Sequence, residues 1–500
     1  MEKTVGIVVV NTNLAYKLNG NDVTNIKVAD APLKWCSVSL SDVISRGKRL
    51  EASVFDIEAK QARDIIMNGK YPCVPLFGEN GLIEKAYYPG RFKRVYCEKG
   101  NGEAFFLPSQ MTDIYPKAEK YISRLTKCDI SELRLKQNTL LLTRSGTIGT
   151  ISLVSKTTEG KVFSDDVIRV TFKNTIDLGY CYTFLKSKLG NIVLQTNGYG
   201  SVITHLEPEH LCETHIPNAP TEIKSKIHNL ILKSFILRDE SNDLIDEATA
   251  MLTNELNLPN IEDLEVDYYK KGVSINTFNV KLSNINGRVD ASYHVPVVSA
   301  INEYLSKYAE KVTTIGDKGI SSDIVLPGRF KRVYVDEGYG ITFFSGKNIS
   351  ELNPSDKRYL SFSQHDKKIK DELLIKEGML LVTCSGTIGK CVLVPKHWNE
   401  WAMTHDIIRL ILKEEVNGYC YIWLNSEYGK TILQSYQYGS VVQHIEKEHI
   451  SKMPIPLLKN KNIQNKINTL ALKANEKRYE AYLLEQEALK IMDDEVIFAK

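Results

Sequence analysis

A chain of 500 residues is too long to fold around one hydrophobic core, so two or three domains are expected. Its 43% apolar and 25% charged residues are typical of an ordinary soluble globular protein. A net charge of +3 does not by itself indicate nucleic-acid binding, so any basic surface has to be local.

The first residues, MEKTVGIVVVNTN, favour a buried strand over a secretory leader, because a short apolar run is followed by polar Asn and Thr. No stretch approaches the roughly 20 apolar residues that a membrane-spanning helix needs. The nine cysteines are scattered and form no C-x-x-C pair, which argues against a disulfide framework and a zinc ribbon. We therefore expect a cytoplasmic protein.

The dominant feature of the sequence is an internal repeat. The octapeptide PGRFKRVY occurs at 89–96 and again at 327–334. LLLTRSGTIGTISLV at 140–154 corresponds to LLVTCSGTIGKCVLV at 380–394, and DDVIRV at 165–170 to HDIIRL at 405–410. GYCY, a Tyr-Gly-Ser-Val segment followed by Glu-His, and an Ile-Pro pair recur in the same order. A displacement of 238 to 240 residues across these blocks indicates two copies of one domain, and the divergent segments between them suggest one fold adapted to two targets.

Within each copy the pattern predicts a mixed α/β lobe. TLLLT and TISLV predict strands on either side of a Ser-Gly-Thr-Ile-Gly turn, because β-branched and apolar runs interrupted by glycines are a hairpin signal. Residues 178–194 can bury one face of a helix. The Glu-Pro-Glu-His sequence at 207–210 favours the first turn of a short helix.

A heptad pattern follows each lobe. From Ile223 to Met251 and from Ile463 to Ile491, apolar or small residues step by 4 and 3, which predicts two long helices. One seam position is small every seven residues, so we expect the two helices to pair closely and antiparallel, about an approximate two-fold axis. The predicted seam residues are Ile227, Leu230, Ser234, Leu237, Ser241, Leu244, Ala248, Ile467, Leu470, Ala474, Ala481, Leu484 and Ala488.

The expected fold class is α+β, with two homologous mixed lobes separated by two long antiparallel, coiled-coil-like helices in a pseudo-two-fold arrangement. Residues 1–30 have no counterpart in the second half and form an unassigned N-terminal extension. The predicted units are a first lobe at 31–220, a central helix at 221–258, a linker at 259–276, a second lobe at 277–458 and a C-terminal helix at 459–500.

Over roughly residues 33–495 the sequence resembles the specificity subunits of type I restriction-modification systems. RLEAS at 49–53 and RVDAS at 288–292 open the two lobes. The SGTIG turns, the Tyr-Gly-Ser-Val segments and the Ile-Pro pairs follow in the order of that family. The proline-rich junction that is frequent in the family is reduced here to IPNAPTE and IPLLKNK, so the geometry of the junction stays open.

The resemblance implies a non-catalytic DNA-recognition subunit whose lobes are target-recognition domains, each reading one half of a split double-stranded site. It implies two methyltransferase subunits that dock on the helices and flip out the target adenines, with S-adenosylmethionine bound in those partners. Restriction (translocase) subunits that use ATP and Mg would join them. Neither the bases read nor the gap between half-sites follows from the sequence.

Two alternatives were weighed against this interpretation. In the first, the chain is the specificity or adaptor subunit of a related restriction or phage-defence complex, which sequence alone does not separate from type I. In the second, it is a self-contained DNA methyltransferase or nuclease. The second lacks an Asn-Pro-Pro-Tyr or Asp-Pro-Pro-Tyr box for a flipped base and a glycine-rich turn for a methyl donor.

The sharpest basic feature is the RFKR segment of each copy. In an extended strand its first Arg and its Lys share one face, while the second Arg takes the other face with Phe. Arg can fork onto guanine or phosphate, and Lys can neutralise phosphate. A solvated strand face kept alike by duplication is the alternative. The candidate DNA-binding residues are Arg91, Lys93, Arg94, Arg329, Lys331 and Arg332.

The SGTIG turns are a second candidate contact. Glycine permits close backbone approach, so the turn amides and hydroxyls could meet phosphate, although a plain hairpin turn explains the same residues. Arg144 becomes Cys384 in the second copy, so base reading by Arg144 would belong to one half-site only. The candidate hydroxyls are those of Ser145, Thr147, Ser385 and Thr387.

A third candidate precedes the short helix of each copy. Its N-terminus suits phosphate capture, and simple helix capping is the alternative. The candidate residues there are Tyr199, Ser201, Tyr438 and Ser440. No metal site is expected at the paired histidines, because a five-residue gap is wrong for one helix face and no third ligand is near. These histidines are His205, His210, His444 and His449.

Overall fold

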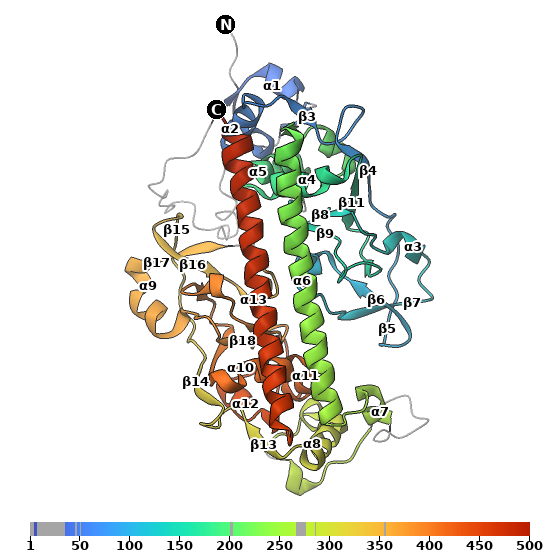
Figure 1. Cartoon of the computed structure of the whole chain (residues 1–500), viewed down its shortest axis with the longest axis vertical. Coiled ribbons are helices and arrows are strands. Elements are labelled where there is room, and N and C mark those ends of the chain that lie inside the picture. Colours follow the sequence, from blue (N-terminus) through green and yellow to red (C-terminus); the bar gives the residue numbers. More distant parts are fainter. Residues whose placement is uncertain are drawn as a thin grey trace, which may run out of the picture.

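The structure is a computed structural model that describes residues 5–7, 36–45, 48–50, 52–200, 204–266, 277–285, 287–354 and 357–500. Two long helices, α6 (Thr221–Glu255) and α13 (Lys461–Ile491), run side by side along its longest axis (Figure 1). Most strands that precede α6 lie on one side of this pair, and most that lie between α6 and α13 in sequence are on the other. None of the described helices is long and apolar enough to cross a membrane.

The chain before α6 forms two four-stranded sheets, in the orders β4-β11-β8-β9 and β10-β6-β7-β5, and a two-stranded sheet β12-β3. A further short pair joins β1 and β2. The elements are β1 (Val5–Ile7), β2 (Cys36–Val38), α1 (Leu40–Ser45), α2 (Ile57–Met67), β3 (Cys73–Pro75), β4 (Ile83–Tyr87), β5 (Tyr96–Cys97), β6 (Gly102–Phe106), β7 (Lys120–Ser123), α3 (Ile130–Leu133), β8 (Leu140–Thr143), β9 (Ile151–Leu153), β10 (Val162–Phe163), β11 (Val167–Phe172), α4 (Thr175–Lys186), α5 (Lys188–Thr196) and β12 (His215–Pro217).

The chain after α6 repeats these three sheets in the same strand order, as β14-β21-β18-β19, β20-β16-β17-β15 and β22-β13. The fold is therefore mixed α+β, as predicted, and each arrangement of strands is built twice. The elements are α7 (Ile261–Val266), α8 (Pro296–Tyr308), β13 (Lys311–Thr314), β14 (Ser321–Val325), β15 (Tyr334–Val335), β16 (Gly340–Phe344), β17 (Arg358–Ser361), α9 (Phe362–Lys368), β18 (Leu380–Thr383), β19 (Cys391–Leu393), β20 (Ala402–Met403), β21 (Ile407–Leu412), α10 (Glu414–Asn425), α11 (Glu427–Ser435), α12 (Lys447–Ser451) and β22 (Pro454–Leu457).

One detail of the predicted organisation is wrong. Residues 178–194 form two helices rather than one, because α4 ends at Lys186 and the next residue, Ser187, caps α5 by accepting a hydrogen bond from the Gly190 amide at 3.2 Å. The segment predicted as a linker, 259–276, contains the helix α7. The domain boundaries stay predictions.

The predicted hairpin on either side of the SGTIG turn is present in both halves, as β8 with β9 and β18 with β19. The neighbouring strand carries a buried arginine, Arg169 in β11 and Arg409 in β21. Each guanidinium donates to backbone carbonyls, for example to Val167 O at 2.5 Å and to Ile407 O at 2.6 Å. Burial lowers the pKa of both arginines to about 10, so both stay charged at neutral pH. The matched arginine of DDVIRV and HDIIRL thus has a structural role, because it joins backbone segments inside each lobe.

Each lobe packs on one long helix through its GYCY motif, with α4 against α6 and α10 against α13. A Cβ added at Gly179 would lie 2.7 Å from His228 Cα, and one at Gly418 would lie 2.4 Å from Asn468 O, so only glycine permits this approach. The adjacent tyrosine hydroxyl, Tyr180 in the first copy, donates to Pro217 O at 2.5 Å. The motif therefore fixes the lobe to its helix and to the following Ile-Pro strand.

The two long helices are antiparallel, since residues near the start of α6 contact residues near the end of α13, and the reverse. Lys226 reaches Glu495 in the turn after α13, whereas Lys466 pairs with Glu247. The small seam residues are fully buried between the helices: Ser234, Ser241, Ala248, Ala474, Ala481 and Ala488. The hydroxyl of Ser234 donates to Ala481 O at 2.7 Å, a contact that only closely spaced backbones permit.

A buried charge cluster lies where α4, α6 and α13 meet. Glu485 of α13 is only 1% exposed, and it forms ion pairs with Arg238 of α6 and, at 3.2 Å, with Lys186 of α4. Burial alone would raise the pKa of Glu485, but the charges of Lys186 and Arg238 lower it to about 2. The carboxylate therefore stays ionised and joins the lobe to both helices.

Replacing Glu485 by Gln is expected to destabilise the protein by about 3 kcal/mol, because two largely buried cations lose their buried carboxylate partner. The measurement is the midpoint of urea unfolding at pH 7. Glu487→Gln is the matched control, since Glu487 lies on the same helix but is exposed, and its change should stay within about 0.5 kcal/mol. Equal midpoints for the two variants would contradict a stabilising role for the cluster.

The two lobes also touch directly beside the helix pair. Asp113 and Glu351, which lie 238 residues apart and so correspond in the repeat, are bridged as antiparallel neighbours. The Ile114 amide donates to Ser350 O at 2.9 Å in the same contact. Burial, with Glu351 and Glu119 adding to it, raises the pKa of Asp113 to about 6.

Asp113→Asn is expected to raise the stability near pH 8, because the folded wild type must hold a carboxylate there in its less favoured charged form. One pKa unit corresponds to about 1.4 kcal/mol, and partial exposure reduces the total, so we expect a gain of about 2 kcal/mol. The difference in unfolding free energy between the variant and the wild type should grow as the pH rises from 3.8 towards about 6 and then stay constant. Unfolding midpoints of both proteins at pH 5 and pH 8 check this. A gap that is larger at pH 5 would contradict the raised pKa.

Candidate nucleic-acid interface

Three repeated motifs come together in each lobe. The residue before the SGTIG turn is held by the DDVIRV or HDIIRL segment, since Arg144 N donates to Asp166 O at 3.0 Å and Cys384 N to Asp406 O at 3.2 Å. The turn also meets the strand-like segment that carries His205 or His444. The RFKR segment reaches the same place through Arg94, whose guanidinium contacts Asp165 and Asp166. The order of motifs in the sequence thus becomes one surface cluster in space.

The RFKR segments do not form strands, so that prediction is wrong. Residues 91–95 and 329–333 are connections without regular secondary structure. Exposure nevertheless alternates: Arg91 and Lys93 are exposed, whereas Phe92 and Arg94 are partly buried. The second copy has the same pattern, with Arg329 and Lys331 exposed and Phe330 and Arg332 partly buried. Two cations of each segment therefore face solvent.

Arg94 is occupied inside the first lobe. Its guanidinium lies 2.6 Å from the buried Asp165 carboxylate and 3.6 Å from Asp166, and it donates to Ser164 Oγ at 3.0 Å. Burial lowers the pKa of Arg94, but the hydrogen bond and charge of Asp165 outweigh burial, so the pKa lies above its ordinary value. Arg94 acts here as an ion-pair partner.

Arg144 is not at the surface of this structure, and its role as a DNA contact stays a prediction. Its side chain is 7% exposed, pairs with Glu207 at 2.6 Å and lies over the Tyr88 ring at 4.2 Å from the centroid. Cys384, its counterpart, is buried as well. The prediction rested on a single arginine. Its partner Glu207 lies 63 residues further along the chain, so no local sequence pattern indicated this ion pair.

The hydroxyls of the SGTIG turns differ in availability. Thr147 and Thr387 are exposed, whereas Ser145 and Ser385 are partly buried. Ser145 donates to Asp166 at 2.9 Å. The amides of Gly146 and Gly386 donate within the protein, to Thr204 O and Gln443 O. The threonine hydroxyls are therefore the more accessible donors of these turns.

The predicted phosphate site at the short-helix N-terminus stays a prediction, and an acidic residue lies at the N-cap position of each short helix. Glu207 precedes the helical turn Pro208–Cys212 and Glu446 precedes α12, and the amide of each donates to a histidine Nδ1 of the helix at 3.0 Å. The Tyr199 hydroxyl donates to Glu207 at 2.8 Å, and Tyr438 does the same with Glu446. Burial would raise the pKa of Glu207, but hydrogen bonds from Arg144 and Tyr199 lower it, so the site stays negative.

Tyr199, Tyr438 and Ser440 remain exposed, and Ser201 lies outside the described residues. No group of three His, Cys, Asp or Glu side chains within the described ranges could hold a metal ion. The residues that sequence reasoning missed are the acids of the cluster, Asp165 and Asp166. The segment DDVIRV was recognised only as a repeat of HDIIRL. Its two adjacent acids were the signal in the sequence for an ion pair with a basic segment.

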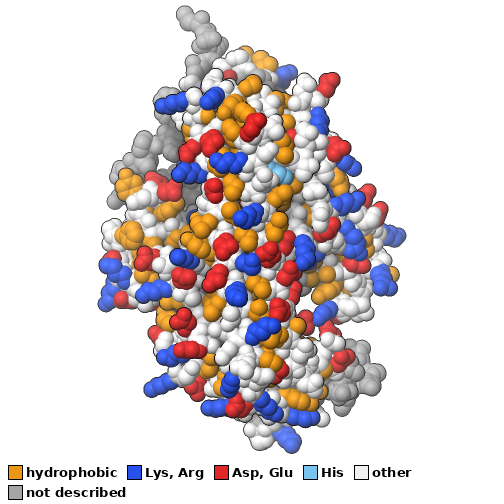
Figure 2. Space-filling model, viewed as in Figure 1, with side chains coloured by type: hydrophobic (Ala, Val, Ile, Leu, Met, Phe, Trp, Pro, Cys, Tyr) orange, Lys and Arg blue, Asp and Glu red, His pale blue; other side chains and the backbone are white. Residues whose placement is uncertain are grey.

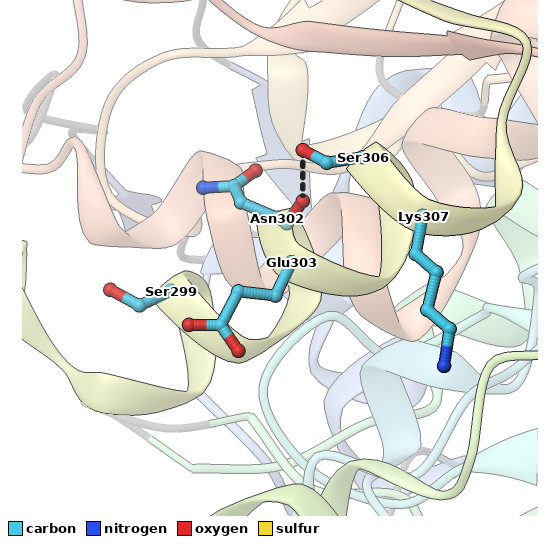
Figure 3. A pocket seen from close by; sticks show the side chains of 5 residues that line it. All are labelled: Ser299, Asn302, Glu303, Ser306 and Lys307. Carbon is cyan, nitrogen blue, oxygen red and sulfur yellow. Dashed lines mark hydrogen bonds between the residues drawn. The ribbon is translucent and has the colours of Figure 1, made fainter.

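A hollow along α8 lies apart from this cluster (Figure 3). Its lining residues come from one face of that helix, and the Ser306 hydroxyl donates to Asn302 O at 2.8 Å within it. Glu303 and Lys307 are its charged residues. The hollow is shallow, open to solvent and lined by one helix face alone, so it does not enclose a ligand and is no candidate site.

Comparison with known proteins identifies the class of domain. Residues 342–470 match the family model described as Type I restriction modification DNA specificity domain. This match agrees with the resemblance inferred from the sequence, which is confirmed over this part of the chain. No curated protein matches the chain.

Three solved structures are similar to the chain at low identity. The S subunit of the type I restriction-modification system from M. genitalium has 13% identity and a TM-score of 0.27, covering 85% of this chain and 98% of its own. The HsdS subunit from Thermoanaerobacter tengcongensis has 11% identity and a TM-score of 0.25, covering 85% and 99%. A chain from a structure of complex assembly and conformational transition of the type I R-M system has 12% and 0.26, covering 83% and 98%.

Proposed function

We propose that the chain is the DNA sequence-specificity subunit of a type I restriction-modification system. In this role it binds a bipartite double-stranded site, one half per lobe, and scaffolds two methyltransferase subunits and restriction subunits. The observation that carries the proposal is the repeated exposed Arg-x-Lys pair, found in equivalent places of two lobes that one helix pair holds together.

The exposed cations have the properties that phosphate contact requires. Among the described residues, no carboxylate forms an ion pair within 4.0 Å of the four exposed cations, which are Arg91, Lys93, Arg329 and Lys331. Their charge is therefore available to a polyanion, and each neutralised phosphate would release counterions. Thr147 and Thr387 lie on the adjacent turns and add neutral donors.

The helix pair supports the scaffolding part of the proposal. On the face shown in Figure 2, which α6 and α13 cross, basic and acidic side chains are interspersed, with apolar side chains between them. Such a mixed surface suits a protein partner better than a polyanion. In this proposal S-adenosylmethionine is bound by the methyltransferase subunits, and ATP and Mg by the restriction subunits, while this chain performs no catalysis.

The double variants Arg91→Ala/Lys93→Ala and Arg329→Ala/Lys331→Ala are each expected to weaken binding to duplex DNA. Each lost phosphate contact should flatten the slope of log K against log salt by about 0.9, so about two units per double variant. Fluorescence anisotropy of the full chain with a labelled duplex at several salt concentrations measures the slope.

Lys473→Ala/Lys490→Ala is the matched control, because it removes two exposed cations from α13 rather than from a lobe. Its slope should stay close to that of the wild type. If all three double variants change the slope equally, binding follows overall charge and the RFKR segments are not the contacts.

The purified chain alone is expected to transfer no methyl group to DNA and to cut none. Co-expressed with its methyltransferase, it should purify with two copies of that subunit, and methylome sequencing should reveal a split target with a fixed gap. Methyl transfer by the isolated chain, supplied with S-adenosylmethionine, would sink the proposed role.

A further inference from the structure

The two RFKR segments are identical in sequence but have different partners. Arg94 and Arg332 occupy equivalent places, since each guanidinium lies over an equivalent phenylalanine, at 5.5 Å from Phe105 and 5.6 Å from Phe343. In the first lobe the nearest partner is Asp165, at 2.6 Å and with a side chain only 6% exposed. The repeat places His405 at the position of Asp165 in the second lobe.

Arg332 consequently has neutral partners. It donates to Thr404 Oγ1 at 2.9 Å and to His405 Nδ1 at 3.4 Å. Among the described residues no carboxylate lies within 4.0 Å of its guanidinium, whereas Arg94 has two. Arg332 therefore keeps a full charge without an internal counterion.

The same geometry fixes the state of His405. A guanidinium has only donors, so Nδ1 must accept and the ring proton sits on Nε2, which lies 3.5 Å from Asp406. Burial lowers the pKa of His405, and Arg332, Arg329 and Lys368 lower it further against the opposing charge of Asp406. The imidazole is neutral at pH 7, so it does not replace the missing negative charge.

This difference decides how a phosphate meets each arginine. At Arg94 a phosphate oxygen would compete with a carboxylate at 2.6 Å, be repelled by it and leave a buried charge unpaired. At Arg332 it would displace only a hydroxyl and an imidazole nitrogen, and Thr404 keeps a hydrogen bond to Asp406 at 3.3 Å. A charge-assisted bond then replaces two neutral acceptors.

We propose that Arg332 is a phosphate-binding residue of the second lobe, while Arg94 is a structural ion pair, and that the exchange of Asp165 for His405 determines which of the two binds DNA. This rests on the proposed DNA-binding function. The two halves then hold the DNA backbone unequally, with three cations of the motif in the second lobe and two in the first.

The test uses the full chain and a duplex of random sequence, with affinity measured by anisotropy over a range of salt. Arg332→Ala should flatten the log-log slope by about one unit, whereas Arg94→Ala should keep the slope but lower the unfolding temperature. His405→Asp should flatten the slope as Arg332→Ala does, although every arginine is kept. His405→Asn, which preserves a neutral acceptor, should keep the wild-type slope.

Equal flattening by Arg94→Ala and Arg332→Ala would overturn the inference, as would an unchanged slope for His405→Asp. Asp165→His, the reciprocal exchange, is a second test that removes no arginine. It should steepen the slope of log affinity against log salt by about one unit. A wild-type chain that fails to bind duplex DNA would instead count against the proposed function itself, so the two failures are distinguishable.

Discussion

Two helices of 35 and 31 residues stay in contact along their length only if small side chains let their backbones approach and each buried charge between them has an ionic or hydrogen-bonding partner. The seam meets the first condition with serine and alanine on α6 and with alanine on α13. It meets the second with Glu485, which neutralises cations from α4 and α6. Because α4 packs on α6 and α10 on α13, the position of each lobe depends on this pairing.

The helices are repeated but not interchangeable. Arg238 and Arg478 correspond in the two copies, yet Arg238 pairs with Glu485, whereas Arg478 donates to Ser241, Tyr421 and Asn242. The place of Glu485 is taken by Ile245 in the first helix. These ion pairs and hydrogen bonds form when α6 meets α13, which specifies the partner as well as stabilising it.

Much of the architecture could be predicted because it follows from periodic patterns. The repeat, the hairpin around SGTIG and the seam of small residues are each visible within a short window of sequence. The environment of the candidate site could not be predicted in the same way. Arg144 is buried in an ion pair with Glu207, which comes from a segment distant in sequence. The RFKR segment has no regular secondary structure. Charge pairing across long sequence distances leaves no periodic signal.

The same limit applies at the short helices. A helix N-terminus attracts an anion, and the sequence does not say whether that anion is a ligand or a neighbouring side chain. Glu207 and Glu446 were part of the motif that suggested the site, and each accepts a hydrogen bond from a tyrosine of the same motif. A carboxylate beside a helix N-terminus disfavours a second anion there.

The contact of Asp113 with Glu351 has an evolutionary consequence. In a symmetric dimer, a residue on the two-fold axis always meets its own copy, so a single mutation changes both sides and an acid there must always face an acid. A chain that carries both copies is free of this rule, since each side mutates alone. Asp113 and Glu351 already differ by one methylene, and the cost of holding the Asp113 carboxylate charged can be removed by a mutation on that side alone. Gene fusion therefore relaxes selection most strongly at the axis itself.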